Sequence, residues 1–134
     1  MNTSWKQINV VGKASGSFIP ELIEALAGAH INIETLDSDT FGGSVVAMLT
    51  VDRYDDAIRA LTGAGFSAVG EDALLVRVKD EPGALANLVR RFQKAGIPLM
   101  SVRIVSRAGG WGVVAISTPR TTSALELVKN ERIS

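Results

Sequence analysis

The stretch VKDEPGALANLV, residues 78–89, contains residue types that could hold a small charged ligand. Two acids, a proline and a glycine separate an apolar, strand-like run from a helix-like pattern. The N–H groups of a helix's first turn lack partners within the helix and carry partial positive charge, so those of Gly83, Ala84 and Leu85 could receive a carboxylate. Asp80, just before the turn, could receive an ammonium group. An amino acid needs both groups bound at once, and this corner offers both.

The same corner also has a purely structural interpretation. Acids near the start of a helix are favourable without any ligand, and proline and glycine commonly mark such boundaries. Without further information, such a pattern more often caps the start of a helix than binds a ligand. Both interpretations therefore stay open on these residues alone.

The composition excludes several classes of function. Of 134 residues 46% are hydrophobic, and 14 basic and 14 acidic residues give a formal net charge of zero. Nucleic-acid-binding proteins usually show a basic excess, which is lacking here. Cysteine is absent, which excludes disulfides, thiolate metal sites and a cysteine nucleophile. No apolar run approaches the roughly 20 residues of a membrane helix, and the first residues lack the hydrophobic core of a signal peptide, so we expect a soluble cytoplasmic protein.

An internal repeat with a period of about 66 residues organises the chain. Both copies of the first helix place apolar residues at i, i+3, i+4 and i+7, the pattern of an amphipathic helix. These residues are Ile19, Leu22, Ile23 and Leu26 in the first copy and Leu85, Leu88, Val89 and Phe92 in the second. Glycine pairs at 42–43 and 109–110 indicate one hairpin turn in each half.

Each half therefore predicts the order strand, helix, strand, strand, helix, strand. The first half has strands at about 6–12, 31–37, 43–51 and 66–71 and helices at 18–28 and 53–63; the second has strands at about 73–79, 99–106 and 111–118 and helices at 83–95 and 121–130. The fourth strand of the second half is short or missing, because only ERIS follows the last helix.

This order predicts an α+β fold of two tandem ferredoxin-like βαββαβ units, residues 1–71 and 72–134. Each unit would be an antiparallel sheet with both helices on one face. Exposed strand edges favour pairing with further strands, so we also expect a homodimer.

Both halves resemble ACT domains. In the second half the resemblance lies in LLVRVKDEPGALANLVRRFQKAGIPLMSV, with its strand, D-x-P-G-x-L corner, helix and return strand. In the first half it lies in INVVGKASGSFIPELIEALAGAHINIETL. The whole chain resembles the small stand-alone tandem ACT proteins of bacteria and archaea. The resemblance implies a regulatory protein, not an enzyme, that binds an amino acid between paired domains and signals to a metabolic enzyme.

The resemblance also implies which residues bind. Family members often carry a ligand-contacting asparagine on the return strand, which the first copy has as Asn32 and the second replaces with Pro98. Conversely, Ala14 stands in the first copy where the second has Asp80. We predict one strong site, which consists of Asp80, Glu81, Pro82, Gly83, Ala84 and Leu85 facing Asn32 and Ile33. A weaker second site would consist of Ser15, Gly16, Ser17 and Pro98.

Other functions stay open as alternatives. The chain could be a regulatory or interaction subunit of a separate biosynthetic enzyme, similar to the acetolactate synthase small subunit, with weak or no ligand binding of its own. An acylphosphatase-like hydrolase would need an arginine-bearing phosphate loop, which neither corner has. A Ser-His-Asp triad would have to use His30, the only histidine, and no G-x-S-x-G pattern occurs. A lone histidine at a helix end is more often a cap than a ligand contact, and we predict no catalytic residues, cofactor or metal site.

Overall fold

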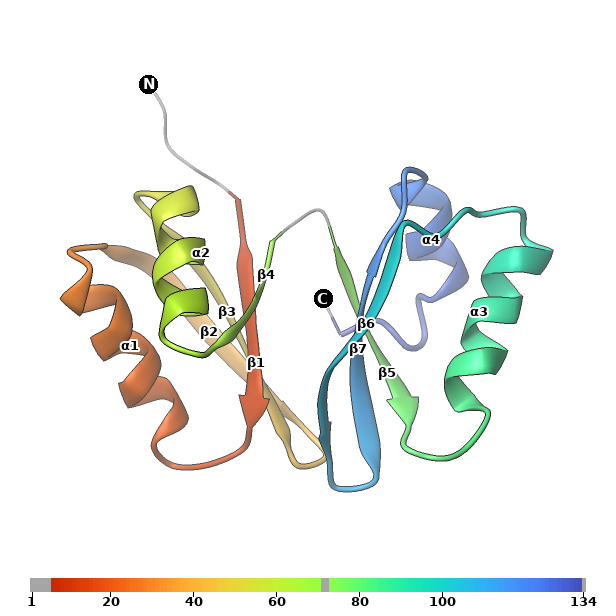
Figure 1. Ribbon diagram of the computed structural model, residues 1–134, viewed down its shortest axis with the longest axis horizontal. Helices are drawn as coiled ribbons and strands as arrows, with labels where there is room; N and C mark the ends of the chain where they lie inside the picture. Colours follow the sequence, from red (N-terminus) through yellow and green to blue (C-terminus); the bar gives the residue numbers. More distant parts are fainter. Residues whose placement is uncertain (1–5, 71–72, 134) are drawn as a thin grey trace. The chain divides into compact units, whose positions relative to one another are not determined.

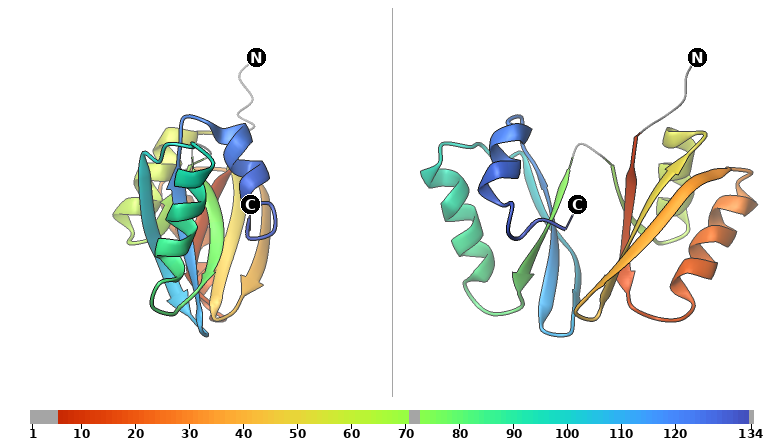
Figure 2. Two further views of the ribbon diagram at one scale, coloured as in Figure 1. Left: turned by 90° about the vertical axis from the view of Figure 1, so that its right-hand side faces the viewer. Right: turned by 180° about the vertical axis from the view of Figure 1, so that it is seen from behind.

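In the computed structural model, which describes residues 6–70 and 73–133, the chain has two compact units, Met1–Glu71 (unit 1) and Asp72–Ser134 (unit 2) (Figure 1). In each unit two helices cover one face of an antiparallel sheet, as two further views show (Figure 2). The predicted α+β class with two βαββαβ-like units is therefore confirmed. Among the helices of the described residues, none is long and apolar enough to cross a membrane.

Unit 1 contains the complete βαββαβ order. Its elements are β1 (Ile8–Lys13), α1 (Phe18–Gly28), β2 (Ile33–Phe41), β3 (Ser44–Val51), α2 (Tyr54–Gly63) and β4 (Ser67–Val69). The strands lie in the order β2-β3-β1-β4, and each neighbouring pair is antiparallel. Alternate residues of β1 and β3, such as Val10 and Leu49, form the core with Leu22 of α1 and Leu61 of α2. β2 extends beyond its predicted end, because residues 38–41 pair with β3 instead of forming a loop.

Unit 2 repeats this arrangement with one strand fewer. Its elements are β5 (Leu74–Lys79), α3 (Ala84–Lys94), β6 (Ser101–Ala108), β7 (Trp111–Ser117) and α4 (Thr121–Leu127), and its sheet has the order β5-β7-β6. Val76, Leu88, Phe92 and Val114 belong to the core between the sheet and the helices. α4 ends three residues earlier than predicted, because the chain turns back toward the edge of β5 after Leu127.

The residues after α4, which we call the tail (130–133), take the place of a fourth strand. Val76 of β5 pairs with Arg132, and two backbone hydrogen bonds of 2.7 and 2.9 Å flank this bridge. In unit 1, Val10 of β1 pairs in the same way with Ala68 of β4. Since β4 is itself only 3 residues long, the two units differ less at this edge than the sequence predicts.

The first three helices end in the same backbone motif. After α1, the N–H of Ile31 donates to the carbonyl of Leu26 over 3.0 Å, and His30 between them has φ 59°. Gly65 after α2 and Gly96 after α3 hold the corresponding position, with φ 90° and 71°. A left-handed residue at this point lets the following N–H groups bind carbonyls of the last helical turn. His30 is thus a helix-ending residue in a conformation that favours glycine.

Candidate functional site

The corner between β5 and α3 is a tight, exposed turn. The N–H of Asp80 donates to the carbonyl of Gly110 over 3.0 Å, and the N–H of Ala84 donates to the carbonyl of Glu81 over 3.3 Å. Gly83 precedes α3 with φ 88° and ψ −13°, a conformation that residues with a side chain rarely adopt. A Cβ atom at Gly83 would have no neighbour within 4 Å. Glycine is therefore required here by the backbone turn and not by close packing.

Two of the three N–H groups predicted to receive a carboxylate lack an acceptor. Within the described part of the chain, no acceptor takes the N–H of Gly83 or Leu85, whereas that of Ala84 is bonded inside the turn. Unbonded N–H groups at the start of a helix favour a nearby anion. The corner therefore keeps two of these donors free of a protein acceptor, and the binding of a ligand at Gly83, Ala84 and Leu85 stays a prediction.

Asp80 has a partner of its own within unit 2. Its Oδ1 atom lies 3.6 Å from the Nε of Arg107 on β6, and the side chains of Asp80 and Arg107 are 45% and 61% exposed. An ion pair this exposed contributes at most about 1 kcal/mol, so an ammonium group could compete for the carboxylate. Sequence patterns do not point to Arg107, because only the pairing of β6 with β7 brings it to the corner.

A small pocket of about 50 Å³ lies beside the corner. Its lining residues come from the end of β5, the corner, α3 and the β6–β7 hairpin, and they are Val78, Lys79, Asp80, Glu81, Leu85, Ile104, Arg107 and Gly112. Sites for small molecules typically have volumes of about 300–1,000 Å³. This pocket is too small to enclose an amino acid, so a ligand at the corner needs a second wall.

Asn32 and Ile33 lie at the start of β2, in unit 1. The backbone N–H and the Nδ2 of Asn32 donate to the carboxylate of Asp52 over 3.0 and 3.3 Å, and the N–H of Asp52 donates to the carbonyl of Asn32 over 3.1 Å. These bonds join the start of β2 to the end of β3, which gives Asn32 a structural role of its own. The predicted meeting of Asn32 with Asp80 stays a prediction.

The corner between β1 and α1 has the same hydrogen bonds but a different backbone. The N–H of Ala14 donates to the carbonyl of Gly43 over 2.8 Å, which repeats the bond of Asp80 in unit 2. At the residue before the helix, however, Ser17 has φ −97°, in the right-handed region, where Gly83 is left-handed. The first copy therefore makes its turn without a left-handed residue before the helix, and the two corners present their N–H groups differently.

The residues of the predicted weaker site are exposed and partly satisfied. The hydroxyl groups of Ser15 and Ser17 lie 3.2 Å apart and are hydrogen-bonded to each other, with Gly16 exposed between them. Pro98 lies in unit 2, where its carbonyl oxygen accepts a hydrogen bond of 2.6 Å from the Oγ1 of Thr118. The weaker site also stays a prediction.

Comparisons with known proteins bear on the fold alone. No protein-family model matches the sequence, and no curated protein matches it either. Protein BT0572 from Bacteroides thetaiotaomicron is similar in structure, with a TM-score of 0.50 at 20% identity over 96% of this chain and 90% of that one. The ligand-free regulatory subunit of aspartate kinase from Thermus thermophilus has a TM-score of 0.44 at 18% identity, over 94% and 91% of the two chains.

The acetolactate synthase small subunit from Thermotoga maritima is a third similar structure, with a TM-score of 0.41 at 9% identity over 96% of this chain and 89% of that one. The match to the Bacteroides protein covers nearly all of both chains and agrees with the α+β fold of the two units. That fold is the one that the resemblance to ACT domains implies.

Proposed function

We propose that the protein is a regulatory module that binds an amino acid and catalyses no reaction. The geometry of the unit 2 corner carries the proposal: Gly83 and Leu85 offer N–H groups to a carboxylate, and Asp80 offers a carboxylate to an ammonium group. An α-amino acid presents these two charges close together, so one corner can bind both. The exposed pair between Asp80 and Arg107 would open at little cost when the ammonium group binds.

In this proposal the two units are ACT-like domains, residues 1–71 and 72–134, and the site includes Asn32 and Ile33 as its second wall. The small volume at the corner, about 50 Å³, supports the need for such a wall. Ser15, Gly16, Ser17 and Pro98 would form the weaker site, since this set has no carboxylate. Ligand binding would shift a homodimer between states, and a cytoplasmic metabolic enzyme would respond to the state with the higher ligand affinity.

A second candidate function is that of an interaction subunit for a separate enzyme, with little ligand binding of its own. One observation favours it: Asp80 is already paired with Arg107, and Asn32 with Asp52. Both predicted anchors of the ligand are thus used within their own units. In this case the exposed surface of the chain, and not a ligand, would carry the regulatory signal.

Thermal-shift measurements with the twenty amino acids test the first proposal. We expect one or a few of them to raise the melting temperature, and calorimetric titration should show that Asp80→Ala weakens the best binder by about tenfold or more. Glu24→Ala, which removes an exposed carboxylate on α1, is the matched control and should bind like the wild type. Unchanged affinity in Asp80→Ala would contradict the proposed site. If no amino acid binds, co-purification of a host enzyme with the chain would favour the second candidate.

A further inference from the structure

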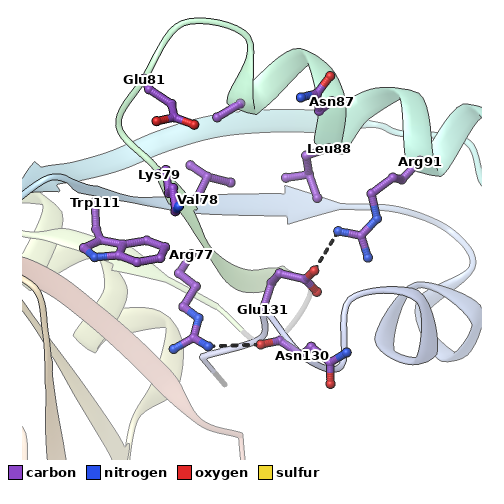
Figure 3. Close-up of a pocket in the computed structure, with 11 residues that line it drawn as sticks. Arg77, Val78, Lys79, Glu81, Asn87, Leu88, Arg91, Trp111, Asn130 and Glu131 are labelled. Carbon is purple, nitrogen blue, oxygen red and sulfur yellow. Dashed lines mark hydrogen bonds and ion pairs between the residues drawn. The ribbon is translucent and has the colours of Figure 1, made fainter.

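Unit 2 has a second and larger pocket, between α3 and the tail, which we call the tail pocket (Figure 3). Its volume is about 410 Å³, within the roughly 300–1,000 Å³ of typical small-molecule sites. Its walls are β5, the face of α3 that carries Ala84, Asn87 and Arg91, the ring of Trp111, and the tail itself. The tail pocket therefore belongs to unit 2 alone and does not involve Asn32.

Unit 1 fills the equivalent space with two aromatic rings. Phe18, the first residue of α1, and Phe66, just before β4, meet edge to face, with ring centroids 5.9 Å apart and an interplanar angle of 77°. The repeat of about 66 residues places Ala84 at the position of Phe18. The replacement of the buried Phe18 ring by the methyl group of Ala84 is thus the first difference that leaves space in unit 2.

The sheet register identifies the second exchange. The pair of Val76 with Arg132 in unit 2 corresponds to that of Val10 with Ala68 in unit 1. Counting back two residues from Arg132 and from Ala68 places Asn130 at the position of Phe66. An amide therefore stands where the first copy has a packed ring, which leaves the tail pocket open in unit 2.

The ion pair at the edge of the tail pocket is also specific to the second copy, whereas Lys79 has an equivalent in unit 1, Lys13. Arg91 donates to Oε1 of Glu131 over 2.7 Å, and Figure 3 shows these two side chains pointing toward each other across the pocket. By the same repeat and register, unit 1 has Ala25 and Ser67 at these positions. Two small uncharged residues in one copy thus correspond to an ion pair beside the pocket in the other.

Glu131 has one carboxylate oxygen without a hydrogen bond. While its Oε1 binds Arg91, its Oε2 is buried and receives no donor from the described residues. A buried oxygen without a donor is unfavourable, and native proteins usually satisfy such groups with a water or a ligand. An N–H or ammonium group of a bound molecule would meet this requirement.

Donors for an anion lie on β5 and α3. Lys79 of β5 lines the tail pocket and makes no ion pair with any of the described residues. Asn87 accepts a bond from Arg90 at its Oδ1 over 2.6 Å, so its amide nitrogen remains the group that can donate. A carboxylate bound at Lys79 and Asn87 would lie in a pocket that Glu131 also lines.

We propose that the tail pocket binds a small zwitterion, with its amine at Glu131 and its carboxylate at Lys79 and Asn87. The proposal goes beyond the function proposed above, because it needs neither Asp80 nor any residue of unit 1. The protein would then have a ligand site inside one unit in addition to any site at the corner.

The first test uses the full chain and molecules that differ in one charge. The twenty amino acids are titrated by calorimetry, and each binder is compared with its decarboxylated amine and with the 2-hydroxy acid that lacks its amine. We expect both analogues to bind about tenfold more weakly or worse, because each loses one charge-assisted contact. Analogues that bind as tightly as the parent would overturn the proposal, as would the absence of any binder at millimolar concentration.

The second test separates the tail pocket from the corner. Asn130→Phe restores the bulk of Phe66, and Glu131→Gln removes the carboxylate charge at nearly constant size; we expect each to weaken binding by about tenfold. Asp80→Ala removes the anchor of the corner and lies outside the tail pocket, so it distinguishes the two sites. Glu24→Ala, an exposed change on α1 outside both sites, is the control that should leave this binding unchanged. If Asn130→Phe fails to fold, Glu131→Gln decides.

The four outcomes differ in what they exclude. Loss of binding in Asn130→Phe and Glu131→Gln alone supports the tail pocket and counts against the corner as the site of that ligand. Loss in Asp80→Ala alone overturns the tail pocket and keeps the corner. Loss in all three variants overturns the independence of the tail pocket, and loss in none overturns both sites.

Discussion

The ring of Phe18 lies directly against Gly12, so that a methyl group on Gly12 would overlap Cε1 of the ring and lie 2.8 Å from its Cδ1. Phe18 is buried, and its ring also contacts Phe66. Gly12 therefore provides the room in β1 that the ring needs. At the equivalent position of unit 2, Val78 carries a branched side chain, which is possible because Ala84 replaces the ring.

Gly12→Ala should lower the free energy of unfolding by about 1–3 kcal/mol, because the Phe18 ring must move within a packed core. Urea denaturation followed by circular dichroism measures this change. In a Phe18→Ala background, which itself costs about 3–5 kcal/mol, the added Gly12→Ala should cost nothing. Equal costs of Gly12→Ala in the two backgrounds would show that the ring is not the cause.

The fold could be predicted from the sequence because its signals are local. The apolar spacing around Leu22 and Leu88 and the glycine pairs at the hairpins each concern residues near one another in the chain. The tail pocket, in contrast, depends on residues that are far apart in sequence. The sequence repeat places Arg132, not Asn130, opposite Phe66, and only the pairing of Val10 with Ala68 and of Val76 with Arg132 identifies the exchange of Phe66 for Asn130.

The position of the candidate site could also be predicted, because its signal is local in the sequence. The pattern at residues 80–85 identifies the corner, but it does not determine which N–H groups are used inside the turn. The left-handed backbone of Gly83 and the bond from Ala84 to Glu81 decide that. Arg107 reaches Asp80 through the register of a hairpin, which no pattern near the corner encodes.

His30→Gly should raise the free energy of unfolding by about 0.5–1 kcal/mol. His30 has φ 59° after α1, and glycine adopts this left-handed conformation without the steric cost of a Cβ atom. Its side chain is exposed, so little packing is lost. Thermal and urea unfolding of the full chain measure the change.

Gly96→Ala is the matched opposite of this substitution. Gly96 ends α3 with φ 71°, and a Cβ atom there would have no neighbour within 4 Å. We therefore expect a loss of about 1 kcal/mol that comes from the backbone conformation alone. A stabilising Gly96→Ala, or a destabilising His30→Gly, would be inconsistent with this reading of the helix ends.

Arg91 and Glu131 should show a measurable coupling in a double-mutant cycle. Their bond of 2.7 Å joins α3 to the tail, and the side chains are 41% and 30% exposed, so screening by solvent limits the coupling energy to about 0.5–1.5 kcal/mol. The cycle compares Arg91→Met, Glu131→Gln and the double variant by urea denaturation. Arg91→Met should be the more harmful single change, because it leaves both oxygens of Glu131 without a donor.

Lys129 and Glu126 provide a control pair in the same unit. Their atoms lie 3.2 Å apart, but the side chains are 65% and 76% exposed, and pairs of this kind usually contribute little to stability. The same cycle on this pair should give a smaller coupling energy than the one for Arg91 and Glu131. A larger value for the exposed pair would mean that the contact with the tail does not stabilise unit 2.

Gly83→Ala should destabilise unit 2 by about 1–2 kcal/mol, since φ 88° is unfavourable for any residue with a Cβ atom. Gly16→Ala is the matched change at the first corner, where no positive φ is required and a Cβ atom would have no neighbour within 4 Å. Gly16→Ala lowers the conformational entropy of the unfolded chain, so it should leave the free energy of unfolding unchanged or raise it by about 0.4–1 kcal/mol. Urea denaturation of the two variants side by side tests this asymmetry.

The same position separates a structural role of the corner from a role in binding. Gly83→Asn should retain most of the stability, because asparagine tolerates the left-handed region better than alanine does. If the N–H groups of Gly83 and Leu85 bind a ligand carboxylate, Gly83→Asn should keep the affinity for an amino acid that binds at the corner. Gly83→Ala should lose that affinity, because relaxation of φ turns these N–H groups away from the ligand. Calorimetric titration at a temperature where both variants are folded measures this difference, and wild-type affinity in Gly83→Ala would leave the corner with only its role as a helix start.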